Sequence, residues 1–277
     1  MGREDGELTL SGLRSRGKSL PRMTTFSLLG PDEPSPFSVE NDRGRSRFIL
    51  VCDHAGRALP RAVGDMGLSE EDRQAHIAWD IGAAGVARRL ARKLDAVLFL
   101  QHYSRLVIDC NRPLEAKDSI PETTGGVIVP GNQALRAEER AARAREIFSP
   151  YHDRVRAEIE ARGGEIYCFV SVHSFTPVLY GERRRFHAGV LYDDDERLAA
   201  PLLDELRSDK DLVVGDNEPY RASPQTDYSI IEHAQKRGMP YVELEVRQDL
   251  IAEAEGQERW AERLTHAILR ACARAGI

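Results

Sequence analysis

Phe48-Ile49-Leu50-Val51-Cys52 runs directly into Asp53-His54-Ala55-Gly56, and this stretch indicates the fold class. A short apolar run of this kind is typical of a buried strand. The polar residues that follow it then lie at the carboxyl end of that strand. The same arrangement recurs where Ile166–Val172 runs into His173-Ser174-Phe175-Thr176. Both stretches predict a sheet whose strand ends carry polar side chains.

From Arg47 onward, further apolar runs alternate with amphipathic stretches. Other strands are expected at Ala96–Leu100, Leu106–Ile108, Gly189–Tyr192, Leu212–Val214 and Tyr241–Val246. Helices are expected at Gly82–Leu94, Ala134–Arg162 with an interruption at Pro150, Glu196–Arg207, Tyr228–Arg237 and Gln257–Ala273. This alternation predicts a single α/β domain with a central, mostly parallel or mixed sheet flanked by helices. Ligands of such sheets bind beyond the carboxyl ends of the strands.

The composition is that of an ordinary globular protein and excludes several classes. The chain has 277 residues, of which 41% are hydrophobic and 30% charged, and its net charge is −6. That charge argues against nucleic-acid binding, because phosphate contacts need a basic surface. No apolar run approaches the length of a membrane span. The four cysteines lack CxxC spacing, so neither a zinc knuckle nor a disulfide framework is predicted, and a cytoplasmic location is expected.

The first 45 residues differ from the rest of the chain. They are rich in Gly, Ser, Pro and charged residues, and they show no sustained hydrophobic periodicity. We therefore expect a disordered leader over residues 1–45 and a folded domain over residues 46–277. Met23 is an alternative start of translation.

The segment Tyr103–Pro113 places two arginines, an aspartate and an asparagine around the apolar run Leu106–Ile108. Charge beside a buried strand is costly unless it has a partner. An arginine is well suited to gripping a planar carboxylate with two parallel hydrogen bonds. The segment therefore predicts either a docking site for a small anion or an internal salt bridge of Arg105 or Arg112 with Asp109.

His54 and His173 follow two of the predicted strands and are candidate metal ligands. A catalytic zinc ion has three protein ligands and one open position. The candidate for the third is Asp80, before the helix Gly82–Leu94, with His76 as a neighbour or an alternative. An acidic residue that stabilises the helix N-terminus explains Asp80 equally well.

Two glutamates lie on one face of the last predicted strand, because side chains in a strand alternate with a period of two. Glu245 is the candidate general base, and Glu243 is its rival. The polar segments Asp216–Tyr220 and Asp227-Tyr228 are predicted loops that either close over a substrate or simply turn.

Taken in order, these segments resemble the N-formylglutamate amidohydrolase family. The matching motifs are Val51–Gly56 with Pro60, Tyr103-Ser104-Arg105 through Asn111-Arg112-Pro113, His173–Pro177, Asp216–Tyr220 and Val242–Leu250. More distantly, the order of the motifs is similar to that of the zinc carboxypeptidase and aspartoacylase superfamily, which has a phosphorylase/hydrolase-like fold. The resemblance covers the chain from residue 47 to its end.

The resemblance implies zinc-dependent hydrolysis of N-formyl-L-glutamate to formate and glutamate, and it implies a role for each matching residue. His54 and His173 would bind Zn²⁺, Glu245 would be the base, and Arg105 would polarise the scissile carbonyl; Asp80 stays the candidate for the third zinc ligand. The substrate carboxylate would be held by Asn111 and Arg112, with Ser174 and Tyr228 as further substrate contacts. The chain departs from the superfamily in the long insertion between His54 and Asp80.

Two alternatives remain open at this stage. One is a related deacylase or carboxypeptidase that acts on another N-acyl amino acid or small peptide. The other is a metal-free protein that binds an acidic metabolite. In each case the expected partner is a small-molecule carboxylate, with neither nucleic acid nor membrane, and the sequence leaves assembly into a homo-oligomer open.

Overall fold

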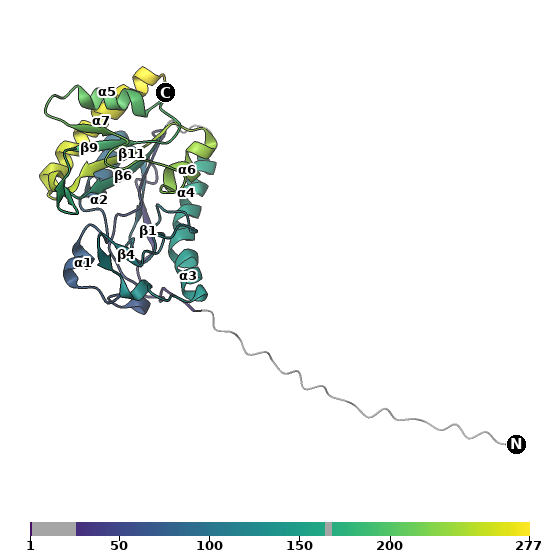
Figure 1. Cartoon of the computed structure of the whole chain (residues 1–277). Helices are drawn as coiled ribbons and strands as arrows, with labels where there is room; N and C mark the ends of the chain where they lie inside the picture. Colours follow the sequence, from purple (N-terminus) through teal and green to yellow (C-terminus); the bar gives the residue numbers. More distant parts are fainter. Residues whose placement is uncertain (2–25, 164–167) are drawn as a thin grey trace.

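The centre of the molecule is a seven-stranded mixed sheet with the strand order β1-β3-β2-β6-β11-β9-β10 (Figure 1). The computed structural model describes Met1 and residues 26–163 and 168–277. The strands of the sheet are β1 (Phe37–Glu40), β2 (Phe48–Cys52), β3 (Val97–Gln101), β6 (Cys168–Phe175), β9 (Ala188–Leu191), β10 (Val214–Asp216) and β11 (Tyr241–Arg247). The pairs β2–β3, β2–β6, β6–β11 and β9–β10 are parallel, whereas β1–β3 and β9–β11 are antiparallel. The predicted α/β domain with a mostly parallel sheet is confirmed.

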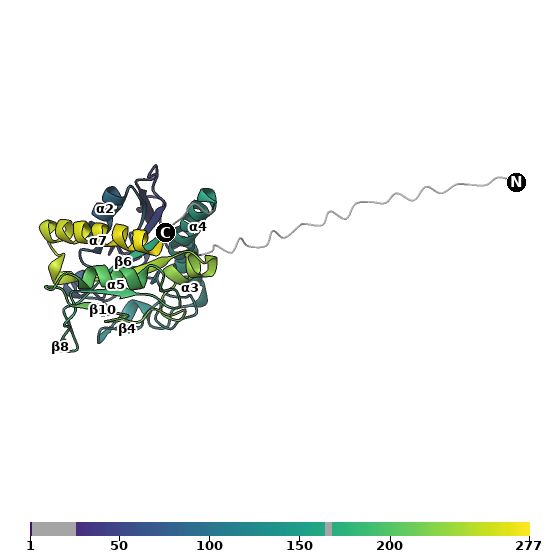
Figure 2. The same cartoon turned by 90° about the horizontal axis from the view of Figure 1, so that it is seen from above.

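Helices cover both faces of this sheet. They are α1 (Glu70–Gln74), α2 (Ala83–Leu94), α3 (Ala137–Arg143), α4 (Ser149–Arg162), α5 (Ala199–Arg207), α6 (Ser229–His233) and α7 (Ala254–Ala275). Short turns of helix are η1 (Arg61–Val63), η2 (Pro130–Asn132), the π-helical η3 (Ala144–Phe148), η4 (Gln235–Arg237) and η5 (Gln248–Leu250). Figure 2 shows the long α7 between α2 and α5.

Strand periodicity divides the core into two layers. Val170 and Val172 of β6 point to one face, where they join a buried apolar cluster with α2, α5 and α7. Phe169 of β6 and Tyr241 of β11 point to the other face, toward α3, α4 and α6. The polar residues of β6 and β11 share this second face, and they continue it toward the carboxyl ends of the strands.

The predicted strand Leu106–Ile108 is wrong. These residues are buried but form a turn, in which the Val107 N–H donates to the Ser104 carbonyl at 2.9 Å. Their carbonyls are satisfied by side chains in place of a neighbouring strand. Asn132 donates to Leu106 at 2.8 Å, and the buried Arg143 donates to Val107 at 2.8 Å. An apolar run alone does not distinguish a buried strand from a buried turn.

The other predicted elements are present with shifted ends. The long helix changes to π-helix over Ala144–Phe148, directly before the first turn of α4, which contains Pro150, a residue without a backbone N–H. The predicted helix Tyr228–Arg237 is divided into α6 and η4. The first two residues of the strand predicted over Ile166–Val172 lie outside the described residues.

Part of the predicted leader belongs to the domain. Most of that segment, residues 2–25, lies outside the described chain. After it, Leu28 is buried, and the Glu146 carboxylate accepts hydrogen bonds from the N–H groups of Leu28 and Leu29 at 2.9 and 2.8 Å. The unpredicted strand β1 pairs with β3. The boundary at residue 45 is therefore corrected: composition does not reveal a short edge strand that depends on its partner for stability.

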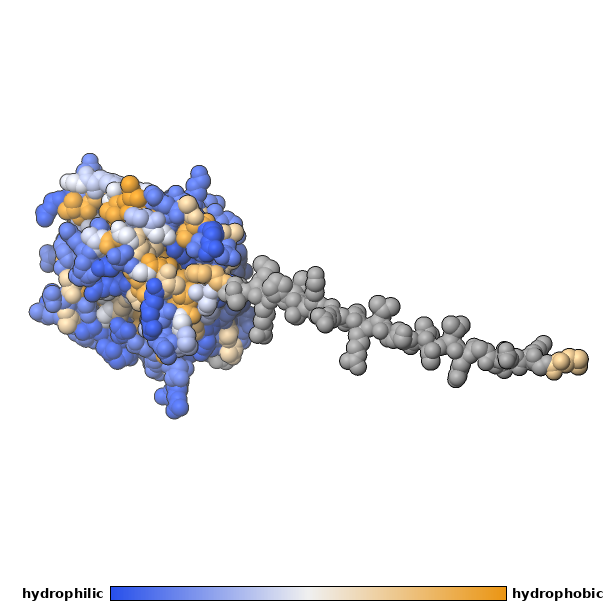
Figure 3. Space-filling model, turned by 90° about the horizontal axis from the view of Figure 1, so that it is seen from below, coloured by the Kyte–Doolittle hydropathy of each residue, from blue (hydrophilic) through white to orange (hydrophobic). Residues whose placement is uncertain are grey.

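Across residues 26–163 and 168–277, every helix is too short or too polar to span a bilayer. The side of the molecule opposite to the view of Figure 2 is largely hydrophilic, with hydrophobic residues gathered near its middle (Figure 3).

Candidate active site

The carboxyl ends of the neighbouring strands β2, β6 and β11 converge on one polar cluster. His173 is near the end of β6 and lies beside Glu245 of β11 in the parallel register. His54 is two residues beyond the end of β2. The chain returns to His54 through Asp80, whose N–H donates to the His54 carbonyl at 3.0 Å. The long insertion between them therefore closes on itself and brings the predicted carboxylate to the histidines.

Asp80 is held in place by the start of α2. The N-cap Gly82 has φ 82°, and a Cβ there would lie 2.2 Å from the Ile251 carbonyl oxygen. Only glycine combines this left-handed backbone with so close an approach. The position directs the chain from Asp80 into the buried helix. The Asp80 carboxylate itself points to the two histidines and does not cap α2.

His54, Asp80 and His173 offer ligand atoms that all lie within 4.8 Å of one another, and all three residues are buried. Asp80 Oδ2 lies 2.8 Å from His173 Nδ1 and 3.3 Å from His54 Nδ1. Asp80 Oδ1 is buried and makes no hydrogen bond within the described chain. Two imidazoles, a carboxylate and an unsatisfied buried oxygen form a donor set that fits a zinc ion.

The ring nitrogens on the far side of both histidines also have fixed partners. His54 Nε2 lies 2.7 Å from Asp109 Oδ1. His173 Nε2 lies 2.9 Å from Ser171 Oγ and 3.4 Å from Asp53 Oδ2. These contacts orient both rings so that Nδ1 faces Asp80.

Burial and charge act in opposite directions on the titratable groups here. Burial alone would raise the pKa of Asp80, but the charge of His54 and the hydrogen bond from His173 hold it well below its usual value. Burial alone would lower the pKa of His173, but Glu243, Asp53 and Asp80 hold it well above its usual value. Both shifts favour the charged forms of Asp80 and His173.

Arg105 makes the salt bridge that was one of the two predictions for its segment. Its Nη2 lies 2.6 Å from Asp109 Oδ2, and its Nη1 lies 3.6 Å from Asp80 Oδ1. The side chain is 22% exposed and also lines a cavity at the carboxyl ends of these strands. Asp109 thus bridges Arg105 and His54, and Arg105 keeps donors directed toward the cavity.

Both ends of the Asn111 side-chain amide, predicted as part of a carboxylate clamp, already make hydrogen bonds within the protein. Its Oδ1 accepts from the N–H groups of Tyr228 and Ser229 at 3.1 and 3.0 Å, and its Nδ2 donates to Glu243 at 3.1 Å. Only part of the Arg112 guanidinium is available to bind a substrate carboxylate. Its Nε pairs with Asp118 at 2.8 Å, and its Nη1 donates to the Thr226 carbonyl.

The two further predicted substrate contacts, Ser174 and Tyr228, lie in different surroundings. Ser174 lines the cavity, but its hydroxyl donates to the Ile81 carbonyl at 2.9 Å. Tyr228 is half-buried and is not among the residues that line the cavity; its ring packs on Phe148 and His152 at centroid distances of 4.9 and 4.6 Å. A sequence motif does not reveal toward which side a loop tyrosine turns.

Glu245 and Glu243 differ in their hydrogen bonds. Both are buried, line the cavity, and have pKa values raised first by burial, to about 8 for Glu243 and well above the usual value for Glu245. Glu243 is held by Asn111, whereas Glu245 Oε2 has no hydrogen-bond partner in the described residues. This difference favours Glu245 as the group that is free to take a proton.

These residues surround a cavity of about 460 Å³. Its outer wall comes from segments without a predicted role, which include Ile77, Thr124, Gly125, Leu179, Tyr180, Tyr220 and Arg221. Ile77 lies between α1 and α2, and the others lie on the hairpins β4 (Thr123–Thr124) to β5 (Val127–Ile128) and β7 (Val178–Leu179) to β8 (Glu182–Arg183), and on the loop after β10. The loops Asp216–Tyr220 and Asp227-Tyr228 signalled part of this wall in the sequence, through Tyr220 and Asp227.

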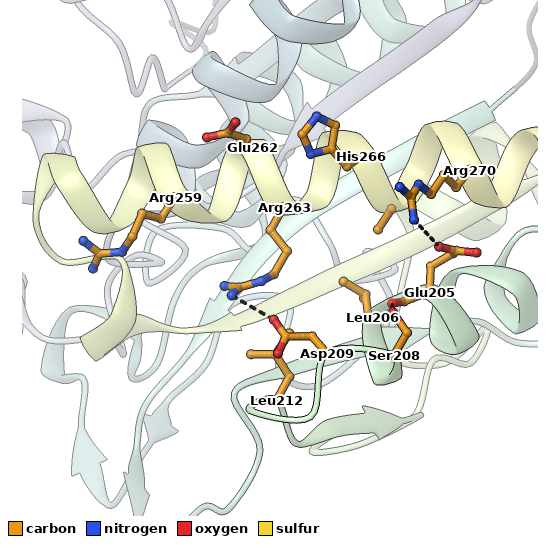
Figure 4. Close-up of a pocket in the computed structure, with 11 residues that line it drawn as sticks. Glu205, Leu206, Ser208, Asp209, Leu212, Arg259, Glu262, Arg263, His266 and Arg270 are labelled. Carbon is orange, nitrogen blue, oxygen red and sulfur yellow. Dashed lines mark hydrogen bonds and ion pairs between the residues drawn. The ribbon is translucent and has the colours of Figure 1, made fainter.

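A second cavity of about 430 Å³ lies between α5 and α7 (Figure 4). Two of its arginines pair with acidic side chains of the same wall: Arg263 lies 3.0 Å from Asp209, and Arg270 lies 3.6 Å from Glu205. It lacks the converging ligand set of the first cavity, so we assign the chemistry to the cavity at the strand ends.

Comparisons with known proteins place the chain in a family. Residues 46–252 match the N-formylglutamate amidohydrolase family. An N-formylglutamate deformylase of Pseudomonas aeruginosa is 31% identical over 157 residues, which are 51% of this chain and 58% of that protein. One of Pseudomonas putida is 33% identical over 129 residues, 43% of this chain and 47% of that protein. The chain thus spans about half the length of the curated relatives that it matches.

Solved structures extend the comparison to the whole domain. A gene product of Agrobacterium tumefaciens is 36% identical with a TM-score of 0.87, over 90% of this chain and 100% of the other. An N-formylglutamate amidohydrolase of Ralstonia eutropha shares the fold, with 21% identity and a TM-score of 0.65 over 88% of this chain and 100% of the other. Because the family match covers most of the sequence, the chain belongs to the N-formylglutamate amidohydrolase family.

Proposed function

We propose that this protein is a zinc-dependent amidohydrolase that cleaves N-formyl-L-glutamate to formate and L-glutamate. One observation carries the proposal: His54, Asp80 and His173 converge beside the unpaired Glu245 oxygen, in a cavity lined by arginines. The names of the curated relatives support the substrate. Family membership supports the class of reaction.

His54, Asp80 and His173 would hold the metal ion. When bound, zinc supplies Lewis acidity, which lowers the pKa of water to about 7 and polarises a carbonyl oxygen. Asp109 and Ser171 keep the two imidazoles turned toward the metal side through their other ring nitrogens.

Glu245 takes the proton of the attacking water and passes it to the nitrogen of the leaving amine. Its burial favours this role, because the raised pKa of the carboxyl group brings it closer to that of the groups with which it exchanges the proton. Gln at this position would keep the shape but could not accept the proton.

Arg105 donates to the formyl oxygen as negative charge develops there. Its salt bridge to Asp109 fixes the guanidinium before the substrate arrives, so little reorganisation is needed. Removing one such donor commonly costs about 100- to 1,000-fold in turnover.

Arg112 binds a carboxylate of the amino acid, and this contact orients the formyl group toward Glu245. Asn111 supports it from behind by holding Glu243 and the Tyr228–Ser229 backbone. We place the reaction in the cytoplasm, because the four cysteines are free thiols, as is usual in a reducing compartment.

The test is a formate-release assay with N-formyl, N-acetyl and N-succinyl derivatives of glutamate, together with metal analysis of the protein. We expect formate from N-formyl-L-glutamate, loss of activity in a chelator, and recovery with zinc. In the Glu245→Gln variant, turnover should fall by about 100-fold or more while one equivalent of zinc stays bound. Activity that survives complete removal of the metal, or a Glu245→Gln variant with normal turnover, would refute the proposed mechanism.

A further inference from the structure

Arg221 lines the cavity at the strand ends and has no part in the mechanism proposed above. Three arginines line this cavity. Arg105 pairs with Asp109, and Arg112 pairs with Asp118. In the part of the chain that the structure describes, no acidic side chain forms an ion pair with Arg221, which is exposed at the cavity wall. The complete guanidinium of Arg221 is therefore available for two parallel hydrogen bonds to a carboxylate.

The loop that carries Arg221 is fixed at its start. The Asn217 N–H donates to the Val190 carbonyl at 3.0 Å, and Asn217 Oδ1 accepts from the Tyr192 N–H at 3.0 Å. The Glu218 carbonyl then packs so closely that a Cβ on Gly189 or Gly215 would lie 2.1 or 2.4 Å from its oxygen. Two glycines on neighbouring strands thus make room for this loop.

The residues around Arg221 are fixed as well. Tyr220 accepts a hydrogen bond from Arg184 Nη1 at 2.7 Å, and the Arg184 guanidinium lies over its ring at 4.6 Å. On the other side, Ala222 is fully buried. The backbone of Arg221 is therefore held between two anchored neighbours, so its side chain is presented to the cavity at a reduced entropic cost.

The same loop is tied to Arg112, since Arg112 Nη1 donates to the Thr226 carbonyl. Arg112 is next to Asn111, whose amide contacts Glu243 at the reacting end of the cavity. A carboxylate on the carbon that bears the scissile amide must stay at that end. A side-chain carboxylate, which is separated from that carbon by methylene groups, reaches farther toward the cavity wall.

We propose that Arg221 binds the side-chain carboxylate of the substrate and thereby selects acidic N-formyl amino acids, while Arg112 binds the α-carboxylate. This inference rests on the proposed function and adds to it the residue that sets the substrate class. A neutral side chain would leave the Arg221 charge without its partner at the wall. Specificity is the difference between the affinity for the acidic substrate and the affinity for a neutral one, and Arg221 affects mainly the first.

The test compares kcat/KM for N-formyl-L-glutamate and N-formyl-L-glutamine, which have the same length and differ in charge. We expect the wild type to prefer glutamate, and the ratio to fall roughly 10- to 100-fold in Arg221→Met, the range for a charge-assisted hydrogen bond. The loss should come from the glutamate substrate alone. Arg221→Lys should restore part of it. Arg185→Met is the matched control, because Arg185 lies over the Phe186 ring and does not line the cavity.

A binding measurement separates this inference from the hydrolytic one. Calorimetric titration of both ligands into the zinc-loaded Glu245→Gln protein, with and without Arg221→Met, reports recognition without turnover. Arg221-dependent binding of the glutamate ligand, with no formate release by the wild type, would support the arginine site and refute hydrolysis. An unchanged glutamate-to-glutamine ratio in Arg221→Met, or equal losses for both ligands, would overturn the assignment of Arg221.

Discussion

The Asp109→Asn substitution tests the link between His54, a proposed metal ligand, and Arg105, the proposed carbonyl-polarising residue. Asp109 is 3% exposed and is shared by His54 Nε2 at 2.7 Å and Arg105 Nη2 at 2.6 Å. Burial alone would raise the pKa of Asp109, but Arg105 and His54 hold it well below the usual value. The carboxylate of Asp109 therefore contacts His54 and Arg105 at once and also accepts from the Asn111 N–H at 2.8 Å, and asparagine keeps its shape without its charge.

The magnitude follows from which contacts remain. Removing one partner of a buried ion pair costs about 3–5 kcal/mol. Asparagine retains one acceptor oxygen, and Arg105 keeps Asp80 at 3.6 Å. We therefore expect the free energy of unfolding to fall by only about 1.5–3 kcal/mol, the value of a hydrogen bond to a charged group. Zinc affinity should fall about 10- to 100-fold, as for other lost partners of metal-binding histidines.

The assay combines urea unfolding of the metal-free protein with competition for zinc against a chromophoric chelator. The control is Asp118→Asn, which removes the exposed partner of Arg112 and should change stability by less than about 1 kcal/mol. If Asp109→Asn binds zinc as tightly as the wild type and unfolds at the same urea concentration, the reasoning about this bridge is refuted.

Two further predictions concern the core. His152 is buried against His233, and burial lowers the pKa of His152 to about 4. In the unfolded chain the histidine pKa is near 6.5, so as the pH falls the unfolded state binds the proton before the folded state does. The free energy of unfolding should therefore fall between about pH 6.5 and pH 4, by up to about 1.4 kcal/mol per pH unit. Urea unfolding at several pH values checks this, and the dependence of the unfolding free energy on pH should be shallower in His152→Gln. Arg143→Met should lower the free energy of unfolding by about 1–3 kcal/mol, because it leaves the buried Val107 carbonyl and Asn132 Oδ1 without their donor. An unfolding free energy equal to that of the wild type would contradict this account.

The local pattern of apolar and polar residues was enough to predict the parallel strands of the sheet. The strands β2, β6 and β11 are short apolar runs, and β11 alternates Glu243 and Glu245 with Val242 and Leu244. Such alternation predicts which side chains share a face before any partner strand is known. The pattern misled at Leu106–Ile108, because burial of a turn produces the same apolar signature as burial of a strand.

The sequence by itself determined the α/β class, the histidines and glutamates at the strand ends, and the arginines of Tyr103–Pro113, since these depend on residue type and short spacing. Only the tertiary structure decided that Asp80 meets His54 and His173, that Glu243 is held by Asn111 while Glu245 Oε2 has no partner in the described residues, and that the Tyr228 ring packs on Phe148. It also brought Arg221 to the cavity wall. These outcomes depend on contacts between segments far apart in the chain, and no local periodicity encodes where such segments meet.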